Sequence, residues 1–168
     1  MKVSVRRATV ADAGAIAALV RALSVEEGYP APPLRAEDVR AEGFGRAPRF
    51  QVLIAEQDGR MVGYALYYPA YDTDHAARGF YLQDLYVRAE ARRRGIGRAL
   101  MAAVARACQA DGGCYLFWNA LGRNRAGRAF YRRIGAREEP VVTLSLQPDA
   151  LRRLAEGAEE PMPGGADR

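Results

Sequence analysis

Arginine and glycine residues between a predicted strand and a predicted helix form the segment of this sequence with the clearest chemistry. The segment is residues 92–97 (RRRGIG); it follows the aromatic and aliphatic run 80–88 and precedes apolar residues at helical spacing. A helix start presents unpaired N–H groups and the positive end of the helix dipole, and glycine lets the backbone approach a ligand closely. The pattern therefore predicts an anion site, and the arginines suit a pyrophosphate.

Two other phosphate-binding loops match these residues less well. A P-loop needs Gly-Lys and then Ser or Thr after the turn, but Arg98 and Ala99 stand there. A dinucleotide-binding turn needs a third glycine in an early strand–helix unit. Leu100 occupies that place, past the middle of the chain. Taken alone, the segment also suits a glycine-containing helix start with solvated arginines.

A second motif follows in residues 124–136 (NRAGRAFYRRIGA). Asn124 suits a helix N-cap, and Gly135 suits the left-handed position just past a helix end. The order RxxGxG and then NxxAxxFYxxxGA, matched here at most positions, resembles the GNAT superfamily of N-acetyltransferases. Within it, roughly residues 3–155 most resemble the spermidine/spermine (diamine) N-acetyltransferases.

The resemblance implies a mixed α/β (α+β) fold. Its central sheet would have six to seven mostly antiparallel strands, about four flanking helices, and a splay between strands four and five. It further implies acetyl-CoA as co-substrate, no metal, and a homodimer. The implied cofactor-binding residues are Leu85, Tyr86, Val87, Arg92, Arg93, Arg94, Gly95, Ile96, Gly97, Arg98, Asn124, Ala126 and Gly127.

The implied reaction is attack of an uncharged amine on a thioester. By resemblance, Tyr131 would protonate the departing thiolate. A phenol of pKa about 10 is protonated at neutral pH and can serve as that acid. The alternative is that Phe130 and Tyr131 only pack their helix onto the sheet.

Deprotonation of the acceptor amine is the harder step. An alkylamine of pKa about 10.4 is neutral in only about one molecule in 2,500 at pH 7, a handicap of roughly 4.6 kcal/mol. The diamine enzymes carry a glutamate where this chain has Gln83, and an amide cannot accept a proton. Asp84, Glu27 and Glu139 are the candidate bases by resemblance, each with an alternative as a solvated charge. Asp84 should lie on the opposite strand face from Gln83 unless a bulge turns it.

The acceptor is predicted to be a small primary amine, either a diamine or polyamine or an amino-acid-like amine. The implied substrate-binding residues are Glu26, Glu27, Gln83, Trp118 and Glu139. Glu139-Pro140 stands where the polyamine enzymes have an aromatic residue. A protein lysine or N-terminal acetyltransferase and a catalytically silent acyl-CoA-binding domain stay open as alternatives.

Length and composition predict one domain. The chain has 168 residues, of which 49% are hydrophobic, enough for a single core over residues 1–156. Residues 157–168 have the composition of a disordered tail. No apolar run approaches the roughly 20 residues of a membrane span, and the N-terminus lacks the apolar run of a signal peptide. Two cysteines favour a reducing cytoplasm.

The net charge of +5 and the pI near 9.5 raise the possibility of nucleic-acid binding. All basic residues except Lys2 are arginine, spread along the chain and densest around the predicted cofactor site. An anionic cofactor explains part of this charge, so nucleic-acid binding is disfavoured. His75 is the single histidine, which makes a multi-histidine metal site impossible.

The remaining elements follow from periodicity and turn signals. Helices are predicted around the stripe 16–23, over 35–43, after the glycine turn and from residue 124, with a break at 28–33 and a loop at 69–78. Strands are predicted at 2–7, 51–56, 61–68, 80–88, 114–118 and 141–146. Asp58-Gly59 is a strong hairpin signal between the second and third strands.

Overall fold

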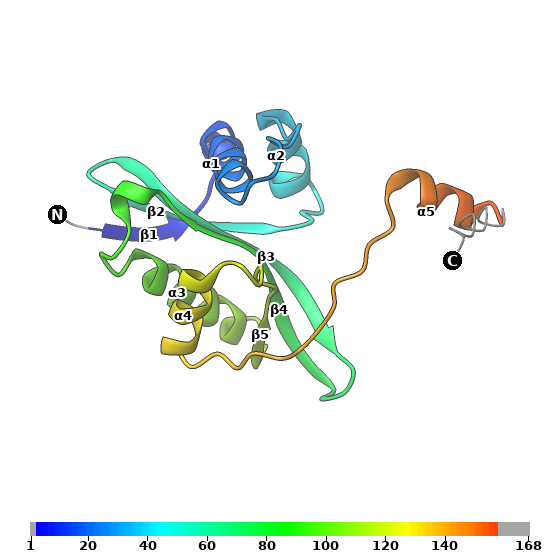
Figure 1. The fold of residues 1–168 in the computed structure, drawn as a ribbon. Coiled ribbons are helices and arrows are strands. Elements are labelled where there is room, and N and C mark those ends of the chain that lie inside the picture. The colour runs from blue at the N-terminus through cyan, green and yellow to red at the C-terminus, as the bar shows by residue number, and fades with distance from the viewer. Residues whose placement is uncertain (1–2, 158–168) are drawn as a thin grey trace, which may run out of the picture. The chain divides into compact units, whose positions relative to one another are not determined.

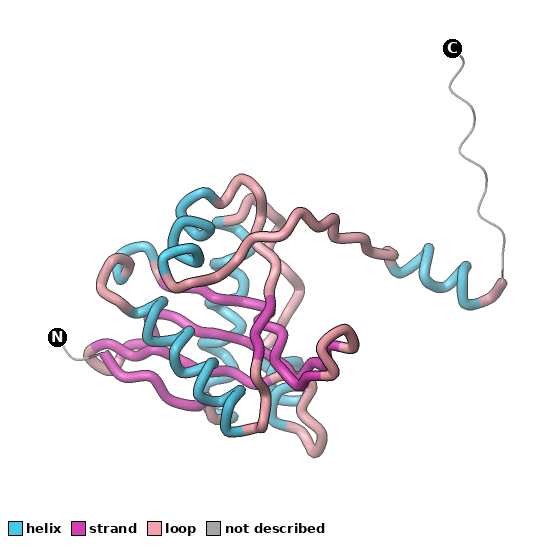
Figure 2. The backbone as a smooth tube through the Cα atoms, turned by 90° about the horizontal axis from the view of Figure 1, so that it is seen from below, coloured by secondary structure: helices cyan, strands magenta, loops and turns pink. Residues whose placement is uncertain are grey.

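Five strands pair in sequence order and form a single sheet in the computed structural model, which describes residues 3–157. They are β1 (Val3–Arg7), β2 (Gln51–Gln57), β3 (Arg60–Asp72), β4 (Ala77–Val87) and β5 (Tyr115–Phe117). Neighbouring strands are antiparallel except β4 and β5, which are parallel. Figure 2 shows the strands side by side. The mixed, mostly antiparallel sheet predicted from the sequence is confirmed.

The chain divides into two compact units, residues 1–128 and 129–168. In the first unit, α1 (Ala13–Glu26) and α2 (Ala36–Phe44) lie on one side of the sheet and α3 (Ile96–Ala110) lies on the other (Figure 1). The helix α4 (Arg125–Arg133) spans the boundary, and α5 (Pro148–Ala155) belongs to the second unit. None of the helices within residues 3–157 has the length and apolar character that crossing a bilayer requires.

The strand count differs from the six to seven that the resemblance implied. Residues 141–146, predicted as a strand, have no regular secondary structure and no strand partner among the described residues. Val142 and Leu144 in this segment are 83% and 87% exposed. Alternating apolar residues form a strand only where a neighbouring strand completes the backbone hydrogen bonds. The tail predicted at 157–168 lies, apart from Gly157, outside the described residues.

The loop predicted at 69–78 is also mostly strand. β3 and β4 continue as a hairpin to Asp72 and Ala77, so that only residues 73–76 turn. Asp72 closes this turn by accepting the N–H of Asp74 at 2.9 Å and that of His75 at 3.2 Å. Cross-strand ring contacts stabilise the hairpin, and Tyr68 and Tyr81 stack with centroids 5.2 Å apart. Such tertiary pairing is not visible in local sequence.

The core between the sheet and α1 contains the predicted apolar stripe. Ile16 and Leu19 are fully buried, and Val20 and Leu23 are partly buried against them. The buried cluster consists of Ala13, Ile16, Ala17, Leu19, Val39, Val52, Ile54, Tyr64, Leu66 and Tyr86. On the other side of the sheet, α3 buries Ile96, Leu100, Met101, Val104 and Cys108. Both helices are thereby fixed against the strands that carry the site.

A charged cluster joins the start of α1 to the first two strands. Arg6 on β1 contacts Asp12 at 2.8 Å and Glu56 on β2 at 2.6 Å. Asp12 also accepts the Thr9 N–H at 2.7 Å. The hydrogen bond from the Arg6 guanidinium holds the pKa of the Asp12 carboxyl well below its usual range. The ionised carboxylate therefore stabilises the folded chain.

Asp12→Asn is expected to lower the free energy of unfolding by about 1–2 kcal/mol near neutral pH, because charge-assisted hydrogen bonds are lost. The folded pKa lies below the unfolded one, so the stabilisation is present above the unfolded pKa of about 3.9 and disappears as the pH falls below it. Thermal unfolding at several pH values measures this. Asp149→Asn, in an exposed pair with Arg152, is the control and should change little. An Asp12→Asn deficit that is the same in acid and at neutral pH would contradict the assignment.

Candidate active site

The loop between β4 and α3 presents a row of unpaired N–H groups. Gly95 has φ +79° as the residue before α3, and Arg93 has φ +60°. The first hydrogen bond into the helix runs from Ala99 N–H to the Gly95 carbonyl at 2.9 Å. Within the described part of the chain, the N–H groups of residues 93–98 donate to no main-chain carbonyl. This cradle can bind an anion at the positive end of the helix dipole.

Burial and charge favour the same use of the cradle. Ile96 is only 2% exposed and anchors the first turn of α3 in the core. The side chains of Arg93, Arg94 and Arg98 are exposed, and among residues 3–157 they form no ion pair. They are available to a ligand with several phosphates. No cluster of three His, Cys, Asp or Glu side chains that could hold a metal lies in the same range.

The splay between β4 and β5 begins close to this cradle in the sequence. The two strands pair only at Gly79–Tyr81 with Tyr115–Phe117. Beyond Tyr81, β4 pairs with β3 on one side and has no partner on the β5 side among the described strands. Leu85, Tyr86 and Val87 lie in this free stretch. The predicted splay between strands four and five is confirmed.

A β-bulge in β4 decides how its polar residues are arranged. Leu66 lies opposite Asp84, but the next residue, Tyr67, lies opposite Leu82. Gln83 is thus the extra residue, left without a cross-strand partner and exposed. The bulge, which the sequence left open, places Asp84 on the same sheet face as its partner Leu66 in the α1-side core.

Asp84 lies in an environment that disfavours its charge. The Tyr64 hydroxyl donates to Asp84 Oδ2 at 2.9 Å, and Tyr64 itself is fully buried. Burial raises the pKa of the Asp84 carboxyl; the Tyr64 hydrogen bond opposes this, and the charge of Glu27 adds to it. Burial also raises the pKa of Glu27, and the positive charge of Arg123 counters that rise. The negative charge of Glu27, at the end of α1, thus acts on Asp84 of β4, and this acidic pair can attract a cation.

Two arginines contact the end of α1. Arg92 donates to the Glu26 carboxylate at 2.5 and 2.6 Å and to the Val87 carbonyl at 2.8 Å. Arg123 donates to the main-chain carbonyl of Glu27 at 2.5 Å. Glu26 and Arg92, both predicted as ligand contacts, are thus paired with each other.

Asn124 caps α4 as the sequence predicted. Its Oδ1 accepts the N–H of Gly127 at 2.8 Å, which orders the first turn of the helix around Ala126. Trp118 is half-buried and directly follows β5. These residues belong to the first unit, together with the cradle and the acidic pair.

Tyr131 and Glu139 belong to the second unit, so the first unit alone does not contain every predicted site residue. Tyr131 lies on α4 beside Phe130, with ring centroids 5.3 Å apart. The helix ends at Gly135 with φ +97°, and Ala136 N–H bonds to the Tyr131 carbonyl at 3.0 Å. This confirms the left-handed helix end predicted for Gly135.

Sequence reasoning missed two residues of the site, Tyr64 and Arg123. Tyr64 lies in an aromatic strand whose pattern indicates only burial. Arg123 binds a main-chain carbonyl, and the pattern of side chains in a sequence does not predict such a partner. Only the fold brings both to the acidic pair.

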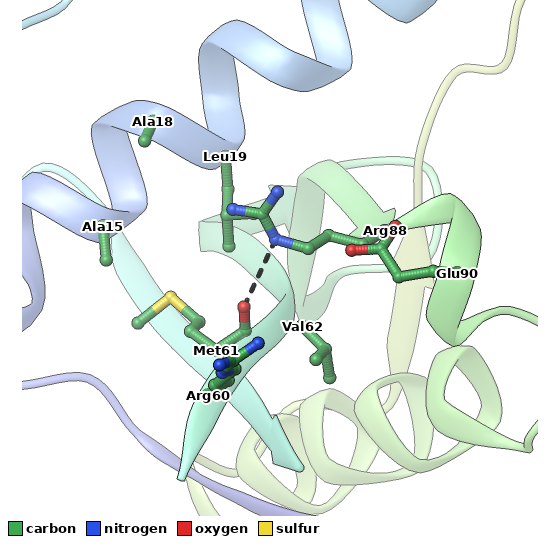
Figure 3. Close-up of a pocket in the computed structure, with 8 residues that line it drawn as sticks. All are labelled: Ala15, Ala18, Leu19, Arg60, Met61, Val62, Arg88 and Glu90. Atoms are coloured by element: carbon green, nitrogen blue, oxygen red, sulfur yellow. Dashed lines mark hydrogen bonds between the residues drawn. The ribbon is translucent and has the colours of Figure 1, made fainter. Parts of the chain in front are cut away.

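A cavity of about 450 Å³ lies apart from these residues. Figure 3 shows the Arg88 guanidinium beside Leu19, and Arg88 Nε donates to the Met61 carbonyl at 3.4 Å. The lining residues are Ala15, Ala18, Leu19, Arg60, Met61, Val62, Arg88 and Glu90. None of the predicted site residues is among them.

The acetyltransferase (GNAT) family matches residues 16–136. The chain belongs to this family. A thialysine N-epsilon-acetyltransferase from Sus scrofa is 35% identical over 167 residues, covering 91% of this chain and 97% of the relative. A human spermidine/spermine N(1)-acetyltransferase-like protein 1 is 33% identical over 105 residues, covering 58% of this chain and 15% of that protein.

The fold of this GNAT chain is also found in solved structures. An integron cassette protein from the mobile metagenome of V. cholerae superposes with a TM-score of 0.77 at 22% identity, covering 93% of this chain and 99% of the other. The resemblance to the GNAT superfamily and to its spermidine/spermine branch is confirmed, and the chain is an N-acetyltransferase by family.

Proposed function

We propose that this GNAT protein transfers the acetyl group of acetyl-CoA to the primary amine of a small molecule, either a diamine or an amino acid with a side-chain amine. The observation that carries the proposal is the buried Asp84 carboxyl, hydrogen-bonded to Tyr64 beside the splay of the sheet and subject to the charge of Glu27. Two carboxyl groups in a partly buried site favour a cationic acceptor. Two relatives are named as a thialysine N-epsilon-acetyltransferase and an L-ornithine N5-acetyltransferase, and these names support the same class of acceptor.

The residues present fit acetyl-CoA. The N–H groups of residues 93–98 would bind the pyrophosphate, and the exposed Arg93, Arg94 and Arg98 would neutralise its charge. The free stretch of β4 at residues 85–87 would align the acetyl and pantetheine part, and Asn124 would bind near the thiol. When bound, acetyl-CoA supplies an electrophilic thioester carbonyl.

Asp84 is the proposed proton acceptor. It would replace the glutamate that the diamine enzymes carry at the position of Gln83. Its raised pKa reduces the gap to the pKa of the ammonium group, and the negative charge of Glu27 would help to hold that group. After Asp84 takes the proton, the amine lone pair can attack the carbonyl carbon. As the carbon–sulfur bond breaks, Tyr131 donates its phenolic proton to the departing sulfur, and the second proton lost by the acylated nitrogen restores the phenol.

An acceptor panel tests the proposal. Thiol release from acetyl-CoA would be followed with lysine-like amino acids, ornithine, diamines, polyamines and lysine-containing peptides. Saturable release is expected with the small amines and a much lower kcat/KM with peptides. Thiol release only with peptides would reject transfer to small amines. Failure of every amine in the panel to cause thiol release would reject it as well.

Gly95→Ala is expected to weaken coenzyme A binding about 5- to 30-fold, because the alanine relaxes out of the left-handed conformation in the free protein and binding must restore it at a cost of roughly 1–2 kcal/mol. A Cβ at this position meets nothing within 4 Å, so the effect is conformational. Gly59→Ala is a matched control, with φ +75° and equally open space in the β2–β3 turn. Calorimetric titration with coenzyme A should show the loss for Gly95→Ala alone. Equal affinities in the two variants would contradict the cradle.

Three wider expectations accompany this function as proposals. The catalytic domain would comprise residues 1–156, the protein would act in the cytoplasm, and it would form a homodimer. Composition supports the first two, and resemblance to the diamine enzymes supports the third.

A further inference from the structure

The end of α1 has a defined conformation that leaves one carbonyl for a side chain. Gly28 has φ +81°, and its N–H bonds to the Val25 carbonyl at 3.0 Å. Tyr29 N–H reaches back to the Ser24 carbonyl at 2.9 Å. These two bonds are a glycine-terminated helix end. The carbonyl of Glu27 accepts neither of them and accepts the guanidinium of Arg123 at 2.5 Å.

A second contact orients the Arg123 side chain. Its guanidinium carbon lies 5.5 Å from the centroid of the Tyr29 ring. A cation at the C-terminal end of a helix is favoured by the helix dipole, and a planar guanidinium can stack on an aromatic ring while it donates hydrogen bonds. Arg123 therefore binds both the last turn of α1 and the residue that follows Gly28.

The main chain of Arg123 is held from the other side. Asn124 N–H bonds to the Leu121 carbonyl, and Arg125 N–H bonds to the Arg123 carbonyl, both at 2.8 Å. The same turn ends in the Asn124 cap of α4. Arg123 thus connects a fixed turn after β5 to the helix end that carries Glu27.

We propose that Arg123 is a positioning residue for the acceptor amine. By binding the Glu27 carbonyl and stacking on Tyr29, it fixes the main chain from which the Glu27 carboxylate reaches the neighbourhood of Asp84. The two carboxylates then act together on one ammonium group. This inference rests on the proposed function. It assigns Arg123 to the acceptor site and not to acetyl-CoA, although Arg123 directly precedes the predicted cofactor residue Asn124.

Arg92 does not duplicate this role. It binds the carboxylate of Glu26, and both side chains of that pair are more than 40% exposed, at 42% and 44%. An ion pair of this kind contributes little. Arg123 binds the main chain, so its effect on Glu27 persists whatever the Glu27 side chain does.

Arg123→Gln is expected to raise KM for the amine about tenfold, corresponding to one lost charge-assisted hydrogen bond. The kcat at saturating amine should change less than about twofold, and KM for acetyl-CoA should not change. Arg123→Lys keeps the charge without the planar fork and should be intermediate. Arg40→Gln removes the same charge from an exposed pair with Glu37 on α2 and should match the wild type.

A double-mutant cycle tests whether Arg123 acts through Glu27. In a Glu27→Gln background, Arg123→Gln should add little to the amine KM, because the group it positions is already neutral. A full tenfold effect in that background, or a rise in the acetyl-CoA KM instead, would overturn the inference. Failure of the proposed function would be distinct, because the wild type itself would then acetylate no amine in the panel.

Discussion

Asp84→Asn is expected to lower kcat/KM for the acceptor amine by about 10²–10⁴-fold, the usual contribution of a general base. The asparagine side chain can still accept the Tyr64 hydrogen bond, which is 2.9 Å long in the wild type. It cannot accept a proton from the ammonium group. Initial rates with varied amine at saturating acetyl-CoA measure the loss.

The pH dependence provides an independent check on this assignment. Because burial raises the pKa of the Asp84 carboxyl, the wild type should lose kcat/KM as the pH falls through a value above the ordinary aspartate pKa of about 3.9. Asp84→Asn should lack that limb. Residual activity within a few-fold of the wild type, or an unchanged acid limb, would exclude Asp84 as the base.

Thermal unfolding separates lost chemistry from lost folding in the same variant. Burial raises the pKa of the Asp84 carboxyl in the folded state above its value in the unfolded chain. Such a group destabilises the folded state as the pH rises from the unfolded-state pKa to the folded-state pKa, because the ionised form is disfavoured when buried. Asp84→Asn should therefore have a Tm at neutral pH that is not below that of the wild type. Asp38→Asn on α2, which loses a carboxylate bonded to the Arg35 N–H, serves as a charge-matched control with normal activity.

Tyr131→Phe is expected to lower kcat by about 10²-fold or more, because the departing thiolate loses its proton donor. The ring and its contact with Phe130 are retained, so coenzyme A affinity should stay within about twofold. Single-turnover rates and calorimetric titration measure the two quantities. Tyr71→Phe, at a ring that is 60% exposed on the β3–β4 hairpin, is the control.

Near-full turnover by Tyr131→Phe would show that another group, or water, protonates the sulfur. The helix position alone does not decide this, since the aromatic pair also suits packing. A loss of kcat in Tyr131→Phe without a loss of coenzyme A affinity distinguishes a general acid from a residue that only packs.

Local signals in the sequence predicted the cradle and the caps. A glycine before an apolar helix fixes the conformation of its own turn, and Asn124 and Gly135 fix the two ends of α4. Such features depend on neighbours within a few residues, so spacing is sufficient to find them. The α1 stripe and the α3 stripe were predictable for the same reason.

The acidic pair was predictable only as a set of candidates. Whether Asp84 shares the α1 face depends on the bulge at Gln83, and a bulge is set by the pairing of β4 with β3. Its proximity to Glu27 depends on how α1 packs on the sheet. The predictions of a strand at 141–146 and of a loop at 69–78 were wrong for the same reason. Strand formation requires a partner that the local pattern does not identify.

A nuclear magnetic resonance titration of the ¹⁵N-labelled chain with coenzyme A determines whether the N–H groups at the start of α3 bind the pyrophosphate. We expect the largest shifts at the main-chain N–H groups of residues 95–98, with a second group at residues 85–87. The alternative outcome is that coenzyme A binds in the cavity shown in Figure 3. Largest shifts at Arg60, Met61, Val62 and Arg88, with the α3 start unchanged, would show that the cradle does not bind coenzyme A.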